Sequence, residues 1–151
     1  MSNKSRILVY IQFSSFAFFA LVGSLFTTKF WLILQFLGLF LGLWGVLVMK
    51  MGNFNIQPEV KNSAIMISRG PYKIIRNPMY SGLILFFGIS VFVNFDFGHL
   101  LFSVLRLFVF MLLTTVLLLK ITMEEKFLSE KFGKNYIQYK MKTKRLIPFI
   151  F

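Results

Sequence analysis

The stretch from Ser68 to Gly82 reads Ser-Arg-Gly-Pro-Tyr-Lys-Ile-Ile-Arg-Asn-Pro-Met-Tyr-Ser-Gly, and it lies between long apolar segments. It contains two prolines, two glycines, two tyrosines and three cations. Prolines break helices and charged side chains are costly in lipid, so this stretch cannot be a membrane span. It predicts a functional site at a membrane surface.

The composition places the chain in a membrane. Of its 151 residues, 57% are hydrophobic and 21 are Phe, whereas soluble domains are about 45–50% apolar. Without cysteine the chain has no disulfide framework and no thiolate nucleophile, and a single histidine argues against a His-built metal site. We therefore expect an all-α integral membrane protein with no metal.

Four apolar runs are long enough to cross a hydrocarbon core of about 30 Å at about 1.5 Å per helical residue. These four expected transmembrane helices cover residues 7–26, 30–49, 78–95 and 100–121. A very short turn at Thr27, Thr28 and Lys29 joins the first two, so we expect them to form an antiparallel hairpin. The first run has no small-residue cleavage pattern, so no cleavable signal is expected. Residues 1–151 should form a single membrane-embedded domain.

Two features inside the spans predict how the helices pack. Gly38, Gly42 and Gly45 recur at helical spacing in the second run, which predicts close approach of another helix. Arg106 lies near the start of the fourth run, where it can reach the outer interface or face the bundle interior. We expect it to reach the interface.

The polar segments also carry helix signals. Asn77 is a favoured N-cap and Pro78 suits a first helical position, so Asn-Pro alone predicts only a helix start. The tail, residues 122–151, is expected to form amphipathic helices broken at Gly133. Thr122 and Glu125 have the spacing of a capping box, although the fourth helix can equally continue through them.

Lysine and arginine are distributed unevenly over the connections. The two short turns carry Lys29 alone, whereas the N-terminus, the connection 50–77 and the tail carry most of the other cations. By the positive-inside rule both termini and the connection 50–77 are cytoplasmic, which agrees with four spans. We expect a multi-pass protein of a bacterial or archaeal inner membrane. Its basic tail should attract anionic membrane lipids and not nucleic acid.

This orientation brings the tail to the same membrane face as the stretch 68–82. Three carboxylates of the tail, Glu124, Glu125 and Glu130, can then meet the cations and tyrosines of that stretch. Alternatively, these acids merely neutralise a basic amphipathic helix.

The combined spacing of these residues resembles the isoprenylcysteine carboxyl methyltransferase family, which is related to phospholipid methyltransferases. The resemblance covers roughly Asn53 to the end of the chain. It is carried by Asn53-Phe54-Asn55, Gly70-Pro71-Tyr72, Arg76-Asn77-Pro78-Met79-Tyr80, Gly82, Glu124-Glu125, Phe132-Gly133, Tyr136, Tyr139 and Ile147-Pro148-Phe149-Ile150.

The resemblance implies a methyltransferase that holds S-adenosyl-L-methionine at the cytoplasmic end of the last two spans, with a lipophilic acceptor entering from the bilayer. Lys120 and Arg76 are then the expected catalytic residues. Lys120 stands where the family usually has an arginine that meets the substrate, and Asn77 stands where it normally has histidine. The expected cofactor-binding residues are Gln57, Ala64, Ile65, Met66, Ile67, Tyr72, Asn77, Pro78, Met79, Tyr80 and Glu124.

The residues fit methyl transfer, which mainly requires alignment of donor and acceptor and the exclusion of water. A carboxylate acceptor is ionised at pH 7 and needs no base, whereas an amine must lose a proton. The single histidine, His99, is predicted on the outer side, which favours O-methylation. The resemblance implies that the acceptor is an isoprenylcysteine-like or other lipophilic carboxylate. N-methylation of a phospholipid or small amine remains open, with Glu or Tyr as base. So does a non-catalytic interaction or transport role, although transporters place polar groups near the midplane.

Overall fold

The computed structural model describes residues 3–22, 25–49 and 65–148, and this part of the chain is built from helices. They are α1 (Asn3–Leu21), α2 (Lys29–Met49), the short 3-10 helix η1 (Gly70–Lys73), α3 (Pro78–Val93), α4 (Leu100–Phe132) and α5 (Lys134–Lys142). The all-α prediction is therefore confirmed for the described residues. By length and composition, α2 and α4 could each cross a membrane, and α3 is a shorter apolar helix.

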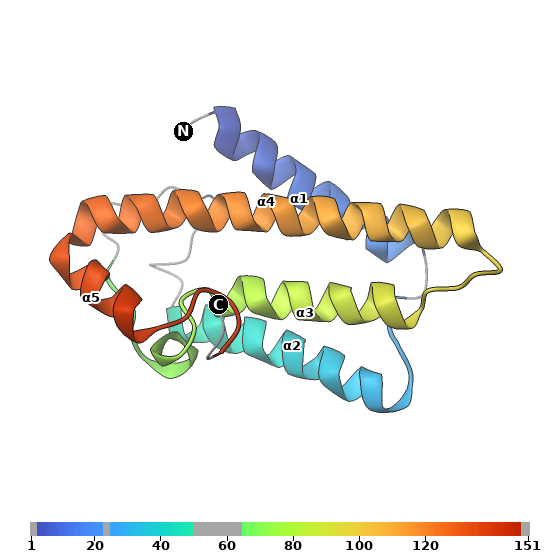
Figure 1. Cartoon of the computed structure of the whole chain (residues 1–151), viewed down its shortest axis with the longest axis horizontal. Coiled ribbons are helices and arrows are strands. Elements are labelled where there is room, and N and C mark those ends of the chain that lie inside the picture. Colours follow the sequence, from blue (N-terminus) through green and yellow to red (C-terminus); the bar gives the residue numbers. More distant parts are fainter. Residues whose placement is uncertain (1–2, 23–24, 50–64, 149–151) are drawn as a thin grey trace.

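The long helices lie roughly along the long axis of the molecule and alternate in direction (Figure 1). The turn between α3 and α4 lies at one end, where α1 ends and α2 begins. η1 and α5 lie at the opposite end, beside the end of α2 and the start of α3. The polar stretch and the tail therefore meet at one end of the bundle, as the sequence predicts.

The predicted hairpin of the first two helices is wrong in its packing. α1 packs mainly against α4, and α2 packs mainly against α3. The turn is held by Gln35 of α2, whose Oε1 accepts hydrogen bonds of 2.8 Å from both the backbone N and the Oγ1 of Thr27. The short turn fixes only the direction of the second helix. A cavity lined by residues of both α1 and α2 lies between the two helices, so they are not closely packed.

The predicted glycine face of α2 is confirmed, and α3 is the helix that it meets. A β-carbon at Gly45 would lie 3.0 Å from Met79 Cγ, and one at Gly38 would lie 3.0 Å from the carbonyl oxygen of Gly82. Gly82 completes the contact from the α3 side. The two backbones thus approach at a distance that side chains would prevent.

The core lies between α1, α3 and α4. Phe19, Phe87, Leu113, Leu117 and Ile121 are buried there. The rings of Phe19 and Phe87 are 4.8 Å apart between centroids, which is within the range of favourable aromatic pairs. This core fixes α4 against α1 and α3 up to the point where the polar site begins.

α4 does not end where the predicted fourth span ends. It continues to Phe132, and Thr122 Oγ1 donates to the carbonyl of Leu118 four residues earlier. Of the two alternatives for Thr122, the continuous helix is therefore the one observed, because Thr122 lies inside α4 and satisfies its hydroxyl within it. The predicted break at Gly133 is confirmed, since its φ of 53° lies in the left-handed region and α5 begins at the next residue.

Arg106 does not reach the outer interface as expected. Arg106 is only 6% exposed. Its Nη2 donates hydrogen bonds to the backbone carbonyl of Ser90 at 3.2 Å and to the Oγ of Ser90 at 3.0 Å. Ser90 lies on α3, so these acceptors are within the bundle. The sequence pattern of α4 does not reveal them.

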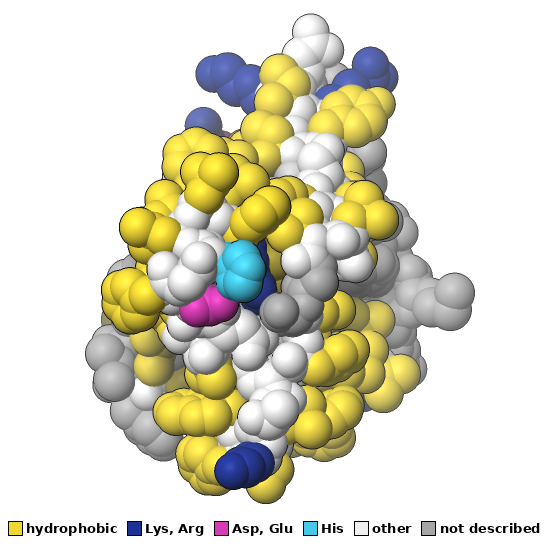
Figure 2. Space-filling model, turned by 90° about the vertical axis from the view of Figure 1, so that its right-hand side faces the viewer, with side chains coloured by type: hydrophobic (Ala, Val, Ile, Leu, Met, Phe, Trp, Pro, Cys, Tyr) yellow, Lys and Arg dark blue, Asp and Glu magenta, His cyan; other side chains and the backbone are white. Residues whose placement is uncertain are grey.

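The end of the molecule opposite the polar site is mainly apolar (Figure 2). On it the chain's single histidine, His99, lies beside Asp96, with 2.7 Å between Nδ1 and Oδ2. Hydrophobic side chains cover much of the described surface around this pair. His99 is therefore far along the bundle from the polar stretch.

Candidate active site

The polar stretch begins with a turn that requires glycine. Gly70 has a φ of 58°, and a β-carbon there would lie 2.9 Å from Val48 Cγ2. The turn leads into η1 and buries Tyr72, whose hydroxyl donates to the carbonyl of Gly45 on α2 at 3.3 Å. The turn therefore anchors the stretch to the end of α2.

The start of α3 is where Asn77 and Pro78 predict it, although Asn77 does not cap it with its side chain. Its Nδ2 instead donates to the carbonyl of Arg145 at 3.0 Å. The backbone N of Arg76 donates to the carbonyl of Lys144 at 2.8 Å, in a short parallel bridge. The tail thus holds the residues that precede α3.

Arg76 is occupied by contacts within the protein. Its Nε is 2.9 Å from Glu125 Oε1, and its Nη1 donates to the carbonyls of Lys140 and Thr143. Lys140 Nζ lies 3.3 Å from the other oxygen of Glu125. These contacts join the polar stretch, α4 and α5, and the predicted catalytic role of Arg76 stays a prediction.

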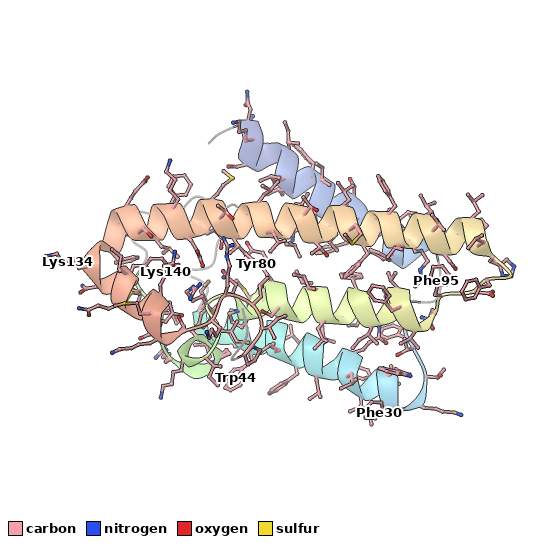
Figure 3. The ribbon with its side chains drawn as sticks, viewed as in Figure 1. Phe30, Trp44, Tyr80, Phe95, Lys134 and Lys140 are labelled. Carbon is pink, nitrogen blue, oxygen red and sulfur yellow. The ribbon has the colours of Figure 1, made fainter. Side chains whose placement is uncertain are left out.

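Of the three carboxylates expected to meet this stretch, Glu124 and Glu125 do so. Glu124 accepts a short hydrogen bond from the hydroxyl of Tyr80 on α3. Glu130 does not, because its exposed side chain pairs with Lys126 at 3.9 Å on the surface of α4. In Figure 3, Tyr80 lies between the ribbons of α3 and α4, toward the end that carries α5.

A small cavity of about 80 Å³ gathers most of the expected cofactor residues. It is lined by Ile65, Met66, Ile67, Tyr72, Asn77, Met79, Tyr80 and Glu124, together with Met49, Arg76, Leu128, Tyr136 and Tyr139. Pro78 is not in its wall and instead packs near Gly45. Gln57 and Ala64 lie outside the described residues. Met49 and Leu128 were missed because neither has a polar group that would mark it in the sequence.

The hydroxyls of Tyr72, Tyr80 and Tyr139 in this cavity donate hydrogen bonds within the protein. Burial raises the pKa of Tyr139 to about 12, and burial also raises the pKa of Tyr72 and of Tyr136 above the ordinary range. Tyr139 donates its hydroxyl proton to the carbonyl of Tyr72 at 2.8 Å. At neutral pH these groups are therefore uncharged.

A larger cavity of about 410 Å³ lies on the other side of Tyr80. Its wall is mostly apolar, and the residues that line it are Gln12, Phe13, Phe16, Gly38, Leu39, Gly42, Leu43, Val46, Met79, Tyr80, Gly82, Leu83, Phe86, Phe87 and Lys120. Its size is within the roughly 300–1,000 Å³ of small-molecule sites. Met79 and Tyr80 line both cavities, so the two are neighbours that share a wall.

Lys120 is the cation of the larger cavity. It is only 1% exposed, and its Nζ donates to Gln12 Oε1 at 2.6 Å and lies 5.6 Å from the centroid of the Tyr80 ring. The structure thus brings together Lys120, Tyr80 and Glu124, as the sequence predicts. Gln12 was missed as a site residue, although a glutamine inside an apolar span is a polar group that needs a partner.

The described helices thus place a polar pocket beside an apolar cavity, with Met79 and Tyr80 in the wall of both. The sequence profile of the phospholipid methyltransferase family matches residues 27–135, which is most of the chain, and the protein belongs to this family. The family is related to the isoprenylcysteine carboxyl methyltransferases, so the resemblance is confirmed at this level. No individual curated protein matches the chain significantly.

Members of this family generally use S-adenosylmethionine, and the chemistry of the small cavity fits that molecule. Its wall offers a carboxylate, tyrosine hydroxyls and apolar side chains, for the polar groups and the ring of such a ligand. Its volume is below the roughly 300 Å³ at which ligand pockets begin. The described residues therefore enclose only part of a ligand of this size.

Proposed function

We propose that the protein transfers a methyl group from S-adenosylmethionine to the carboxylate of a lipophilic, isoprenylcysteine-like acceptor. The small cavity holds the methyl donor and the larger cavity holds the acceptor. The observation that carries this proposal is the position of Lys120, a buried cation at the wall between an apolar cavity and the pocket of Glu124.

When bound, S-adenosylmethionine supplies a methyl group on a sulfonium: an acceptor oxygen forms the new C–O bond while the C–S bond breaks, and the electron pair stays on sulfur. No proton is released, so the protein needs no base. Lys120 holds the acceptor carboxylate. Met79 and Tyr80, which line both cavities, set the direction in which the acceptor oxygen approaches the methyl group. The apolar side chains around them exclude water.

An ammonium at this position favours an anionic acceptor over a protonated amine, which it would repel. His99 lies at the opposite end of the bundle and is not available as a base. The second candidate is N-methylation of a phospholipid or small amine, which the family match favours. In that case Glu124, on the other side of Tyr80, would have to accept the proton.

Two acceptors that share a farnesyl thioether but present different reacting groups separate these candidates. S-farnesyl-N-acetylcysteine carries a carboxylate and an acetylated amine, whereas S-farnesylcysteamine carries a free amine and no carboxylate. The protein, purified in detergent, should bind labelled S-adenosylmethionine and transfer the label to the carboxylate acceptor. Transfer only to the amine would overturn the carboxylate proposal, and absence of cofactor binding would overturn the proposed reaction.

We also expect α1, α2, α3 and α4 to be four spans with both termini in the cytoplasm. This topology rests on the uneven distribution of Lys and Arg and on the grouping of the cation-rich segments at one end of the bundle. Reporter fusions at Lys29 and Asp96 should both report the outer side, and a fusion at Lys134 should report the cytoplasm. A cytoplasmic signal at Lys29 or Asp96 would contradict the topology.

Glu124→Ala should weaken the binding of S-adenosylmethionine by about tenfold, since hydrogen bonds to charged groups contribute about 1.5–3 kcal/mol. Equilibrium binding of the labelled cofactor measures this effect. The matched control is Glu130→Ala, which removes an exposed carboxylate from the same helix. Parental affinity in a folded Glu124→Ala protein would remove Glu124 from the site.

A further inference from the structure

α1 lies outside the segment matched by the family profile, yet it supplies part of the larger cavity. Phe13 and Phe16 line this cavity together with Gln12. Gln12 is only 7% exposed, whereas Phe13, which also lines the cavity, is 48% exposed. The one polar side chain that α1 gives to the cavity is therefore turned inward.

The contact of Gln12 determines which of its atoms a ligand can use. A lysine ammonium can only donate hydrogen bonds, so the amide oxygen, Oε1, is the atom that meets Lys120 Nζ at 2.6 Å. The Nε2 group, with its two N–H donors, remains for a ligand. Because the amide is neutral, it satisfies one N–H of Lys120 without cancelling its charge.

We propose that Gln12 is a specificity-determining residue that binds the acceptor carboxylate together with Lys120. A carboxylate has two oxygens, and the pair offers two kinds of donor at one place, the ammonium of Lys120 and the amide N–H groups of Gln12. The leucine and phenylalanine side chains around them hold the apolar chain of the acceptor. This inference rests on the proposed function and adds that α1 selects the substrate.

The alternative is that Gln12 only provides an acceptor for a buried lysine. Two substitutions separate these roles. Gln12→Leu removes both the contact with Lys120 and the free donors, whereas Gln12→Glu keeps an oxygen for Lys120 and adds a negative charge beside it. A purely structural role predicts that Gln12→Glu is tolerated for every acceptor, because the contact with Lys120 is kept. A role in recognition predicts opposite changes for the two acceptors.

The experiment measures KM for S-farnesyl-N-acetylcysteine and S-farnesylcysteamine, and the equilibrium binding of labelled S-farnesyl-N-acetylcysteine in detergent. Gln12→Leu should raise KM and Kd for the carboxylate acceptor about tenfold, the size of one lost hydrogen bond to a charged group. Gln12→Glu should raise them further and lower KM for the amine. The control is Ser15→Ala on the same helix, since Ser15 is buried but bonds only to the carbonyl of Ile11 in the hydrogen bonds described. All variants should bind S-adenosylmethionine as the parent does.

The possible failures are distinguishable. If the parent methylates the carboxylate acceptor while both Gln12 variants keep the parental KM and Kd, the inference is wrong and the proposed function stands. Equal changes for both acceptors, together with a lower melting temperature, would also overturn it and assign Gln12 a structural role. A parent that methylates only the amine overturns both the inference and the proposed function.

Discussion

Gly82→Ala should lower the melting temperature of the protein and separate α2 from α3. A β-carbon at Gly82 would collide with the carbonyl oxygen of Gly38 and would lie 2.7 Å from the backbone nitrogen of Gly42. Backbone atoms cannot turn away as a flexible side chain can, so the helices must move apart. Overpacking of this kind costs about 1–3 kcal/mol.

Gly42→Ala is the matched control, because a β-carbon there would meet only the carbonyl of Met79, at 3.8 Å. Both substitutions gain up to about 1 kcal/mol of helix propensity, so this gain cancels in the comparison. We expect Gly42→Ala to melt at or above the parental temperature and Gly82→Ala well below it. Gly82→Ala should also weaken S-adenosylmethionine binding, since α3 carries Met79 and Tyr80. Equal melting of the two variants would contradict the close packing.

Much of the smaller cavity was predictable because its residues are close in sequence or carry polar groups. Tyr72 and Tyr80 fall in one polar stretch, and Glu124 follows an apolar run of the length of a membrane span. The charge pattern predicts that these segments meet at one end of the bundle, and the structure brings their side chains into one cavity. The predicted roles of Lys120 and Arg76 remain predictions.

The pairing of the helices was harder to predict from the sequence. The short turn at Thr27 sets the direction of α2, but it does not show that α1 packs against α4. Arg106 was misplaced for the same reason, since Ser90 is recognisable as its partner only when α3 faces α4. Gln12 could not be linked to Lys120 across 108 positions, because apolar helices in a membrane carry little sequence information about which faces meet.

Lys120→Met should lower kcat/KM for S-farnesyl-N-acetylcysteine by roughly ten- to a hundredfold while leaving S-adenosylmethionine binding nearly unchanged. The expected loss is one hydrogen bond between charged groups, about 1.5–3 kcal/mol, and about 1.4 kcal/mol corresponds to tenfold. Lys126→Met is the control, because it removes an exposed lysine from the same helix. It should methylate as the parent does.

Lys120→Met alone also leaves Gln12 Oε1 without its donor, which could unfold the protein for reasons unrelated to the acceptor. The double variant Lys120→Met with Gln12→Leu removes both polar groups, and replacing buried polar partners by apolar ones is often neutral for stability. It should therefore fold and bind the cofactor, yet fail to methylate the carboxylate acceptor efficiently. Lys120→Arg should retain or raise activity, because a guanidinium can hold both oxygens of a carboxylate through two parallel hydrogen bonds. Parental methylation of S-farnesyl-N-acetylcysteine by a folded Lys120→Met protein would show that Lys120 does not hold the acceptor.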